Sequence, residues 1–260
     1  MLVSEVMLQQ TQVQRVVPAW HAFLGRFPTV TACADAAQAE VVRAWSGLGY
    51  NRRAVNLHRI AKTVVDRHGG VLPSDLEELE AMPGVGSYTA RAVRAFAFEL
   101  DAAVIDTNAA RVLARTSGRR LRPREAQALA DELVPQGRSW QWNQTMLDFG
   151  ATVCTRRAPA CDHCPLRAGA CTWARAGFPD PDPADGSAGV PGRQSRFEGS
   201  DRQGRGRLVE AMRSGPVEAT SHSLAAAMGW PNDPERADRV AATLVRDGIA
   251  LVAGDYFVLG

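Results

Sequence analysis

Residues 82–90 read Met-Pro-Gly-Val-Gly-Ser-Tyr-Thr-Ala, a Gly-x-Gly turn between two segments, 75–80 and 89–98, that have helical patterns. The two glycines permit positive φ and let backbone N–H groups approach a partner closely. The N-terminus of the helix that follows favours an anion, and a DNA phosphate suits such a site. A Gly-x-Gly turn alone is equally typical of an ordinary tight turn. The candidate phosphate ligands are Gly84, Val85 and Gly86.

Short helical patterns continue on both sides of this turn, and no alternation long enough for a sheet occurs before about residue 155. We therefore expect a mainly α domain over residues 1–177. Signals for helix starts support it, such as Pro123 at a first helical position. The clearest further helices are expected at residues 36–45, 53–66, 109–115 and 124–133.

The composition changes sharply at residues 178–207, where Pro, Asp, Gly, Ser and Arg dominate. Such a stretch buries too little apolar surface to order itself, so we expect a linker. Beyond it, residues 208–260 have three helical patterns and then a hairpin pattern at 249–259. This order predicts a winged-helix-like module, although such modules also serve as pure protein-interaction domains. The helices are expected at residues 208–213, 223–228 and 236–247.

The first helix, expected at residues 1–8, is apolar on nearly every side and should be buried. It begins without a capping residue, which suggests that the natural protein supplies sequence upstream of Met1. Glu5 lies inside this apolar segment. A solvated acid in the first turn would only favour the helix dipole. Apolar surroundings would instead raise the pKa of Glu5 and make it a general acid near neutrality.

Four of the five cysteines lie within one short stretch with the spacing C-x6-C-x2-C-x6-C. Thiols gathered so closely predict a metal site rather than disulfides. Tetrahedral zinc usually takes two C-x2-C pairs, and only one occurs here. A [4Fe-4S] cluster tolerates uneven spacing because its ligands bind different corners of a cube, so we favour the cluster over structural zinc. The candidate ligands are Cys154, Cys161, Cys164 and Cys171, whereas Cys33 is expected to pack as a small apolar side chain.

Charge and residue usage narrow the chemistry further. The formal charge of the 260 residues is +2, which excludes a polycation that wraps nucleic acid indiscriminately. Lys62 is the only lysine, which excludes most covalent mechanisms based on lysine. No apolar run reaches membrane-spanning length and no charged-then-apolar leader is present, so we expect a soluble cytoplasmic protein.

Taken together, five motifs resemble those of the endonuclease III superfamily of helix-hairpin-helix DNA glycosylases and occur in the same order. Within this superfamily, residues 1–177 are similar to the MutY-type adenine glycosylases, and the segment GSDRQGRGR at 199–207 is similar to their short actinobacterial members. The motifs are SEVMLQQTQ at 4–12, GLGY at 47–50, MPGVGSYTA at 82–90, VIDTNAARVLAR at 104–115 and GATVCTRRAPACDHCPL at 150–166.

The resemblance implies a monomeric, monofunctional adenine glycosylase with a [4Fe-4S] cluster, acting in base excision repair on double-stranded DNA with adenine opposite 8-oxoguanine or guanine. Cleaving the N-glycosidic bond needs an acid for the leaving base and an anion for the oxocarbenium sugar. Glu5 matches the acid and Asp106 the anion, although an Asp before a helix also suits a cap, and the two roles are compatible. Tyr88 stands where lyase-competent relatives carry a Schiff-base lysine, so the product should be an abasic site.

The resemblance also implies contacts with a flipped-out base and with the gap that it leaves. Gln10 and Tyr50 would wedge into the duplex, while Thr11 and Leu48 would contact the 8-oxoguanine. Asp148 aligns with a glutamate that reads the adenine edge in many relatives. From the residues alone, a turn plugged by the side chains of Leu48 and Tyr50 is equally compatible with the pattern. Arginines between the cysteines would face phosphates, namely Arg156, Arg157 and Arg167.

Three departures from the family pattern keep alternatives open. The chain begins after the helix whose arginine lines the adenine pocket in full-length relatives. Ser221-His222-Ser223 only faintly echoes a loop that reads 8-oxoguanine, and it suits a helix N-cap better. The last cysteine interval is one residue longer than usual. The alternatives are a glycosylase for another mismatched base, thymine or uracil, and a non-catalytic DNA-binding module that lacks a complete N-terminus.

Overall fold

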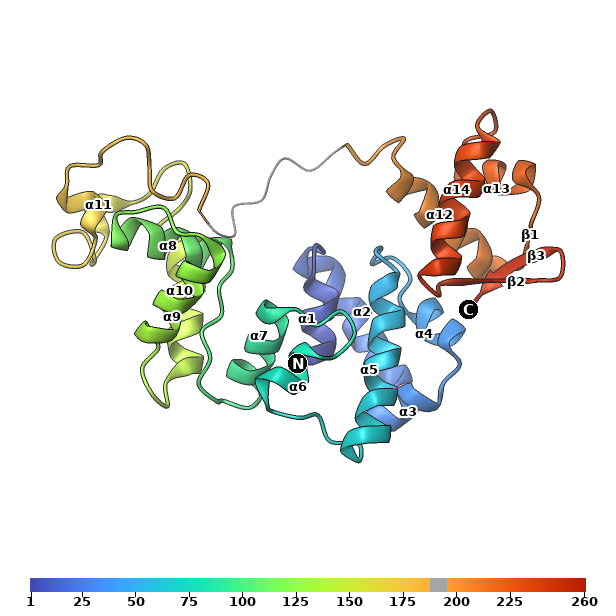
Figure 1. Ribbon diagram of the computed structural model, residues 1–260, viewed down its shortest axis with the longest axis horizontal. Coiled ribbons are helices and arrows are strands. Elements are labelled where there is room, and N and C mark those ends of the chain that lie inside the picture. The colour runs from blue at the N-terminus through green and yellow to red at the C-terminus, as the bar shows by residue number, and fades with distance from the viewer. Residues whose placement is uncertain (188–195) are drawn as a thin grey trace. The chain divides into compact units, whose positions relative to one another are not determined.

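The computed structural model describes residues 1–187 and 196–260 and is mainly helical, as predicted (Figure 1). Apart from Met1, its described residues form two compact units. The middle unit contains residues 74–80 and 85–187, and the terminal unit contains residues 2–73, 81–84 and 196–260. Residues 188–195, which belong to the predicted linker, lie outside the described residues. Of the helices described, none combines the length and the apolar character that crossing a membrane requires.

The terminal unit combines helices from the start of the chain with a small C-terminal module. Side-chain caps begin several of its helices: Thr29 Oγ1 accepts from the backbone N–H of Ala32 at 3.0 Å, and Thr220 Oγ1 accepts from that of Ser223 at 3.2 Å. Its elements are α1 (Leu2–Leu8), α2 (Val13–Arg26), α3 (Val30–Asp35), α4 (Gln38–Ala44), α5 (Arg52–His68), α12 (Asp201–Ser214), β1 (Val217–Glu218), α13 (Ser221–Met228), α14 (Pro234–Arg246), β2 (Ala250–Ala253) and β3 (Tyr256–Leu259).

The middle unit consists of α6 before the hairpin, the helices that follow the hairpin, and the cysteine loop. The predicted start signal at Pro123 is confirmed, because this residue opens α9. Asp75 Oδ1 caps the first helix of the unit by accepting from the backbone N–H groups of Glu77 and Glu78. Its elements are α6 (Leu76–Glu80), α7 (Ser87–Ala97), α8 (Thr107–Ser117), α9 (Pro123–Leu133), α10 (Ser139–Thr152), the 3-10 turn η1 (Cys161–His163) and α11 (Thr172–Arg175).

The sequence around the predicted linker is more ordered at both ends than its composition indicated. Ser187 is buried, and its Oγ accepts from the backbone N–H of Leu121 at 3.0 Å. On the other side, α12 begins at Asp201 rather than at the expected residue 208. Gly204 within this helix is buried, and a Cβ at this position would lie 2.1 Å from the ring of Trp230. Glycine is therefore required here for close packing, although its helix propensity is low.

The hairpin predicted at residues 249–259 is confirmed as the antiparallel pair β2 and β3, with Ala250 opposite Leu259. Within the described part of the module, β1 adds a third strand that the sequence did not indicate, in the order β1-β3-β2. Val217 lies opposite Phe257 in this pairing. A strand of two residues is too short to produce an alternating pattern, which explains why it was missed.

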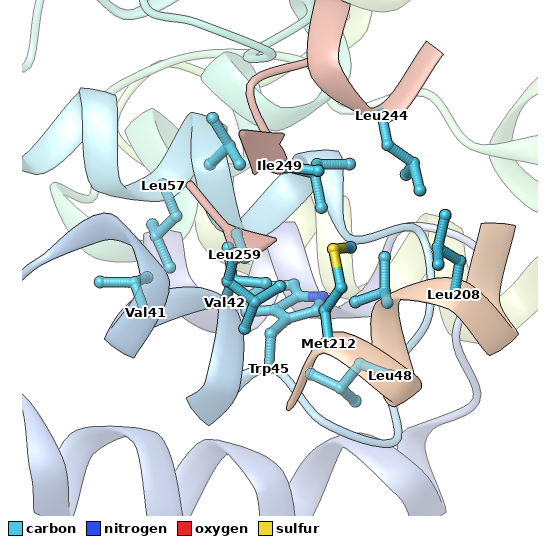
Figure 2. Close-up of a cluster of buried hydrophobic side chains, with 14 of the residues drawn as sticks. Val41, Val42, Trp45, Leu48, Leu57, Leu208, Met212, Leu244, Ile249 and Leu259 are labelled. Carbon is cyan, nitrogen blue, oxygen red and sulfur yellow. The ribbon is translucent and has the colours of Figure 1, made fainter. Parts of the chain in front are cut away.

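The core of the terminal unit is continuous between the N-terminal helices and the C-terminal module. Figure 2 shows side chains of both segments pointing toward a common centre. Polar contacts cross the same boundary, since Gln38 Nε2 donates to Gly248 O at 2.7 Å and Arg213 Nη2 donates to Val42 O at 3.0 Å. The two segments are therefore one packing unit. The labelled core residues are Val41, Val42, Trp45, Leu48, Leu57, Leu208, Met212, Leu244, Ile249 and Leu259.

We predict that truncating a core side chain in the C-terminal module also destabilises the N-terminal helices. Leu208→Ala should lower the free energy of unfolding by about 2–5 kcal/mol, because Leu208 is fully buried. Hydrogen exchange should then accelerate together in peptides covering α4–α5 and α14. Leu251→Ala, at a residue that is 52% exposed on β2, is the control and should change little. Faster exchange confined to the C-terminal module would contradict the shared core.

Candidate functional site

The residues predicted to be functional are divided between the two units. The terminal unit carries Glu5, Gln10, Thr11, Leu48, Tyr50 and Gly84. The middle unit carries Val85, Gly86, Tyr88, Asp106, Asp148, Cys154, Cys161, Cys164 and Cys171.

Glu5 lies in the middle of α1, where the next two residues, Val6 and Met7, are buried in the core. The Glu5 side chain is half-buried. Burial raises the pKa of its carboxyl above the ordinary value, in the direction that the apolar sequence predicted. The carboxyl therefore retains its proton to a higher pH than an exposed glutamic acid, as a general acid requires.

Two turns of the terminal unit, residues 9–12 and 47–50, lie side by side. Thr11 Oγ1 donates to Leu48 O at 3.4 Å, and the guanidinium of Arg15 donates to Gly47 O. Gln10 and Tyr50 have left-handed backbone conformations, with φ of 57° and 48°. Residues with a Cβ rarely adopt this conformation. The predicted contact residues Gln10, Thr11, Leu48 and Tyr50 thus come from two adjacent turns, each with one non-glycine residue in the left-handed conformation.

Leu48 and Tyr50 differ in exposure, although both stand in the same turn. Leu48 is 3% exposed and belongs to the core, whereas Tyr50 is 43% exposed. The interpretation of this pattern as a turn plugged by two core side chains therefore holds for Leu48 but not for Tyr50. The C-terminal module contacts this turn from α12. Arg202 Nη1 donates to the Tyr50 hydroxyl at 3.1 Å, and Arg213 Nη2 donates to Asn51 Oδ1 at 3.0 Å. The module therefore supports an exposed aromatic side chain at the edge of the core.

Arg53, which the sequence analysis did not single out, connects the two turns. It is 7% exposed, and its guanidinium donates to carbonyls of both turns and lies 5.5 Å from the centre of the Tyr50 ring. Burial lowers the pKa of Arg53 to about 10, so that it remains charged at neutral pH. The only signal in the sequence was that Arg53 stands three residues after GLGY. Its acceptors are Val6 O, Met7 O, Gln9 O, Thr11 Oγ1, Leu48 O, Gly49 O and, at 3.5 Å, Tyr50 O.

The predicted hairpin lies between α6 and α7. Gly84 has φ of 75°, and a Cβ there would lie 2.2 Å from the side-chain amide nitrogen of Asn56 on α5, so glycine is required for both reasons. Gly86 has the extended conformation, with φ of −94°, so only one of the two glycines uses positive φ. Gly86 is the N-cap of α7. Because glycine has no side chain, this position supplies no side-chain acceptor for the first N–H groups of the helix.

Asp106 is the N-cap of α8, the structural role that its place before a helix predicted. Its Oδ1 accepts from the backbone N–H groups of Asn108 and Ala109, both at 2.8 Å, and its Oδ2 accepts from Asn108 Nδ2 at 3.0 Å. These donors and the helix N-terminus stabilise a carboxylate anion. Tyr88 lies in the first turn of α7 and is 41% exposed, so its side chain is not a core residue.

Arg111 connects the Asp106 cap to the start of the cysteine loop. Its Nη2 donates to Asn108 Oδ1 at 2.8 Å and to Gly150 O at 2.5 Å, while Nε donates to Cys154 O at 2.6 Å. Burial lowers the pKa of Arg111. This buried guanidinium holds α8, the end of α10 and the first cysteine in one arrangement.

Asp148 lies on the exposed side of α10. Its carboxylate accepts from Gln144 Nε2 at 3.1 and 3.2 Å, one turn earlier in the same helix. Within the middle unit it is therefore a surface carboxylate.

The four clustered cysteines line one cavity, together with Arg115, Arg167 and Trp173. Burial raises the pKa of the Cys154 and Cys161 thiols, so these groups ionise readily only where a positive charge, such as a metal, stabilises the thiolates. Among residues 1–187 and 196–260, no group of three or more His, Cys, Asp or Glu side chains is arranged to hold a single metal ion. Four sulfur donors around one cavity match the ligands of a [4Fe-4S] cluster, which bind different corners of the cube rather than one shared ion.

Arg115 closes this cavity and connects the cysteine loop to the segment before residue 188. Its guanidinium pairs with Asp182 at 2.6 Å, donates to Thr155 O at 2.8 Å, and lies 4.9 Å from the centre of the Trp173 ring. Burial acts to raise the pKa of Asp182, but the hydrogen bond from Arg115 outweighs it, so that the pKa is lowered. The loop is thus held by a largely buried ion pair.

Residues 3–136 match the HhH-GPD superfamily of base excision DNA repair proteins. The chain belongs to this family. It is 40% identical over 258 residues to the adenine DNA glycosylase of Mycolicibacterium smegmatis, which covers 98% of this chain and 84% of the relative. It is also 40% identical over 171 residues to the human adenine DNA glycosylase, which covers 63% of this chain and 31% of the relative.

Solved structures agree with this HhH-GPD membership. A thermostable thymine-DNA glycosylase is similar with a TM-score of 0.63 and 29% identity, covering 67% of this chain and 83% of that one. Endonuclease III in a non-covalent DNA complex is similar with a TM-score of 0.59 over 68% of this chain and 84% of that one, at 24% identity, which shows a common fold. The predicted helix-hairpin-helix glycosylase fold is confirmed.

We predict that Asp182→Asn loosens the cysteine loop. Losing the charge-assisted pair should cost about 2 kcal/mol and accelerate hydrogen exchange at residues 153–160. Because the folded-state pKa of Asp182 is lowered, its contribution is fully present above the unfolded value of about 3.9 and is lost as the pH falls through the folded-state value. The stability difference between the wild type and Asp182→Asn should therefore shrink only in acid. A difference that grows with acidity would contradict the ion-pair account, and Asp185→Asn is the exposed control.

Proposed function

We propose that this HhH-GPD protein is a monofunctional DNA glycosylase that removes adenine paired with 8-oxoguanine or guanine during base excision repair. The observation that carries the proposal is Glu5, a half-buried acid with a raised pKa on the helix that leads directly into the Gln10–Thr11 turn. The likeness to adenine DNA glycosylases over nearly the whole chain supports the choice of base.

The proposed reaction needs two carboxyl groups in different protonation states. Glu5 donates a proton to the adenine, the C1′–N9 bond breaks with its electron pair going to the base, and the sugar becomes an oxocarbenium ion. The Asp106 carboxylate, held by three N–H donors, stabilises that cation. Water then adds to C1′ and loses a proton. The products are free adenine and an abasic sugar.

A lyase step is not part of the proposal, because Tyr88 stands where a Schiff-base lysine would act and Lys62 is the only lysine. Lys62 lies on α5, within the terminal unit, whereas Tyr88 lies on α7. The tyrosine would instead lie beside the sugar. The DNA strand should therefore stay intact until the abasic product is treated with alkali.

The two bent turns are the proposed elements that enter the duplex as a monomeric enzyme binds. Gln10 and Tyr50 would fill the gap left by the extruded adenine, which costs less at a mispair than at a normal pair. Thr11 and Leu48 would contact the 8-oxoguanine. Leu48 would do so only with the small part of its surface that is exposed, because its side chain is largely buried. Asp148 would read the adenine, and the backbone of Gly84, Val85 and Gly86 would bind a phosphate.

We also propose that a [4Fe-4S] cluster is bound by Cys154, Cys161, Cys164 and Cys171. The spacing of these residues supports this assignment over zinc, and all four line one cavity. The bound cluster would supply the covalent ties that fix the loop in shape. Arg156 and Arg157 are exposed on the same loop, where they would face DNA phosphates and make the affinity fall with salt.

Glu5→Gln should slow adenine release from an A:8-oxoguanine duplex by about 10²–10⁴-fold in the single-turnover rate. In the wild type the rate should fall as the pH rises through the raised pKa of Glu5, because the protonated form is the active one. The measurement is strand cleavage by alkali after incubation, with Glu235→Gln on the surface of α14 as the control.

The same assay should include duplexes with T:G and U:G pairs. Base release only from the T:G or U:G duplex would favour a glycosylase for thymine or uracil instead. A thymine-DNA glycosylase is among the similar structures. No release from any duplex, or full activity in Glu5→Gln, would contradict the proposed function.

Cys164→Ala should lower the iron content and the visible absorption near 400 nm that a [4Fe-4S] cluster gives, together with specific DNA binding, roughly in proportion. Cys33→Ala is the matched control. Cys33 is buried in the core, where burial raises the pKa of its thiol to about 11, so this change should leave iron unaffected. Stoichiometric zinc without iron in the purified protein would replace the cluster with a zinc site.

A further inference from the structure

We propose that Arg53 is a positioning residue that holds both DNA-facing turns in their bent conformations before DNA binds. The inference rests on the proposed function, since it assigns a role in presenting Gln10 and Tyr50 to the duplex. Arg53 itself lies beneath these residues. It is buried and would touch neither the reacting base nor the sugar.

One side of the guanidinium closes the end of α1. Nη1 donates to Val6 O at 2.9 Å, to Met7 O at 2.8 Å and to Gln9 O at 2.6 Å. The last carbonyls of a helix have no partner within the helix, and a basic side chain near the C-terminus can satisfy them. Because α1 is short and is followed at once by the turn, these bonds fix the backbone on the N-terminal side of Gln10.

The other side of the guanidinium holds the second turn and joins it to the first. Nη2 donates to Leu48 O at 3.2 Å, to Gly49 O at 3.0 Å and to Thr11 Oγ1 at 3.0 Å. The carbonyls of Leu48 and Gly49 directly precede Tyr50, and Thr11 directly follows Gln10. Trp45 Nε1 donates to Gly49 O at 3.2 Å, and the guanidinium lies 5.3 Å from the centre of the Trp45 ring.

The bent backbone explains why such a hub is needed. Left-handed φ at Gln10 and Tyr50 is disfavoured for residues with a Cβ, and it persists only where surrounding contacts determine it. Arg53 donates to groups on both sides of Gln10 and to the carbonyls that precede Tyr50. The two residues that would enter the duplex are thus the two whose backbones this guanidinium constrains.

Lysine cannot reproduce this arrangement. Arginine presents five N–H donors in a planar fork, whereas the lysine ammonium is a single point with three donors. The acceptors recorded for Arg53 are backbone carbonyls and one hydroxyl, and they lie around both ends of the fork. Arg53→Lys therefore keeps the charge and removes the simultaneous hold on the two turns.

The test compares wild type, Arg53→Lys and Arg94→Lys as full-length proteins. Arg94 is the matched control because it is a half-buried arginine of the middle unit that also donates to carbonyls, those of Ser74 and Asp101. The first measurement is hydrogen exchange without DNA at residues 9–12 and 47–51. The second is the single-turnover rate on an A:8-oxoguanine duplex, with 2-aminopurine beside the adenine to report unstacking.

We expect faster exchange in both turns of Arg53→Lys, a smaller 2-aminopurine signal, and a rate reduced about 10- to 100-fold at saturating enzyme, the size expected for misplaced groups. Visible absorption and circular dichroism should remain those of the wild type. Millimolar methylguanidinium should partly restore the rate of Arg53→Ala but not that of Glu5→Gln. Arg94→Lys should change neither turn.

Unchanged exchange in the turns, or an unchanged rate in Arg53→Lys, would overturn the proposal. Loss of the overall fold in Arg53→Lys and also in Arg53→Gln would overturn it as well, since Arg53 would then be a general stability residue. Failure of the proposed function appears differently. In that case the wild type releases no adenine, whereas the exchange measurement on free protein still reports whether Arg53 holds the turns.

Discussion

Buried guanidinium groups that donate to backbone carbonyls hold the functional segments of this protein in place. Arg53 joins the end of α1 to the Gly47–Tyr50 turn, and Arg111 joins α8 to the start of the cysteine loop. Arg115 does the same for the rest of that loop, with Asp182 as its counter-ion. Carbonyls at helix ends and in irregular loops otherwise need water, and burying them unpaired is costly. The planar fork satisfies several at once.

This use of arginine limits how much of the site can be read from a sequence. Glu5 was a candidate because its apolar neighbours predict a raised pKa. Asp106 was a candidate because VIDTNAARVLAR resembles a family motif, and its place before α8 also indicated the cap that the structure has. Arg53 has no such local signature. All but one of its hydrogen-bond acceptors are main-chain carbonyls, up to 47 residues away, and carbonyls leave no trace in residue identity. The motifs therefore indicated candidate residues in the two turns but not the arginine that joins these turns.

The fold was predictable where local patterns decide it and not where close packing does. The start signal at Pro123 and the hairpin pattern at 249–259 gave a helix and two strands close to the observed bounds. The segment around Gly204 appeared too polar and too rich in glycine to form a helix. It forms a helix whose Gly204 packs directly against the ring of Trp230, where a larger residue would not fit. This tertiary contact is not visible in the local sequence. Ser187 likewise becomes ordered by bonding to the distant Leu121.

The terminal unit takes its core from both ends of the polypeptide, and this has a consequence for synthesis. As the chain leaves the ribosome, the middle unit can fold once its own residues have emerged, because its packing clusters are drawn from residues 92–146. Helices α1–α5 precede the middle unit in the chain, yet Trp45 and its neighbours gain their C-terminal partners only when α12 and the strands are released. These helices are thus made before the middle unit but are fully enclosed after it.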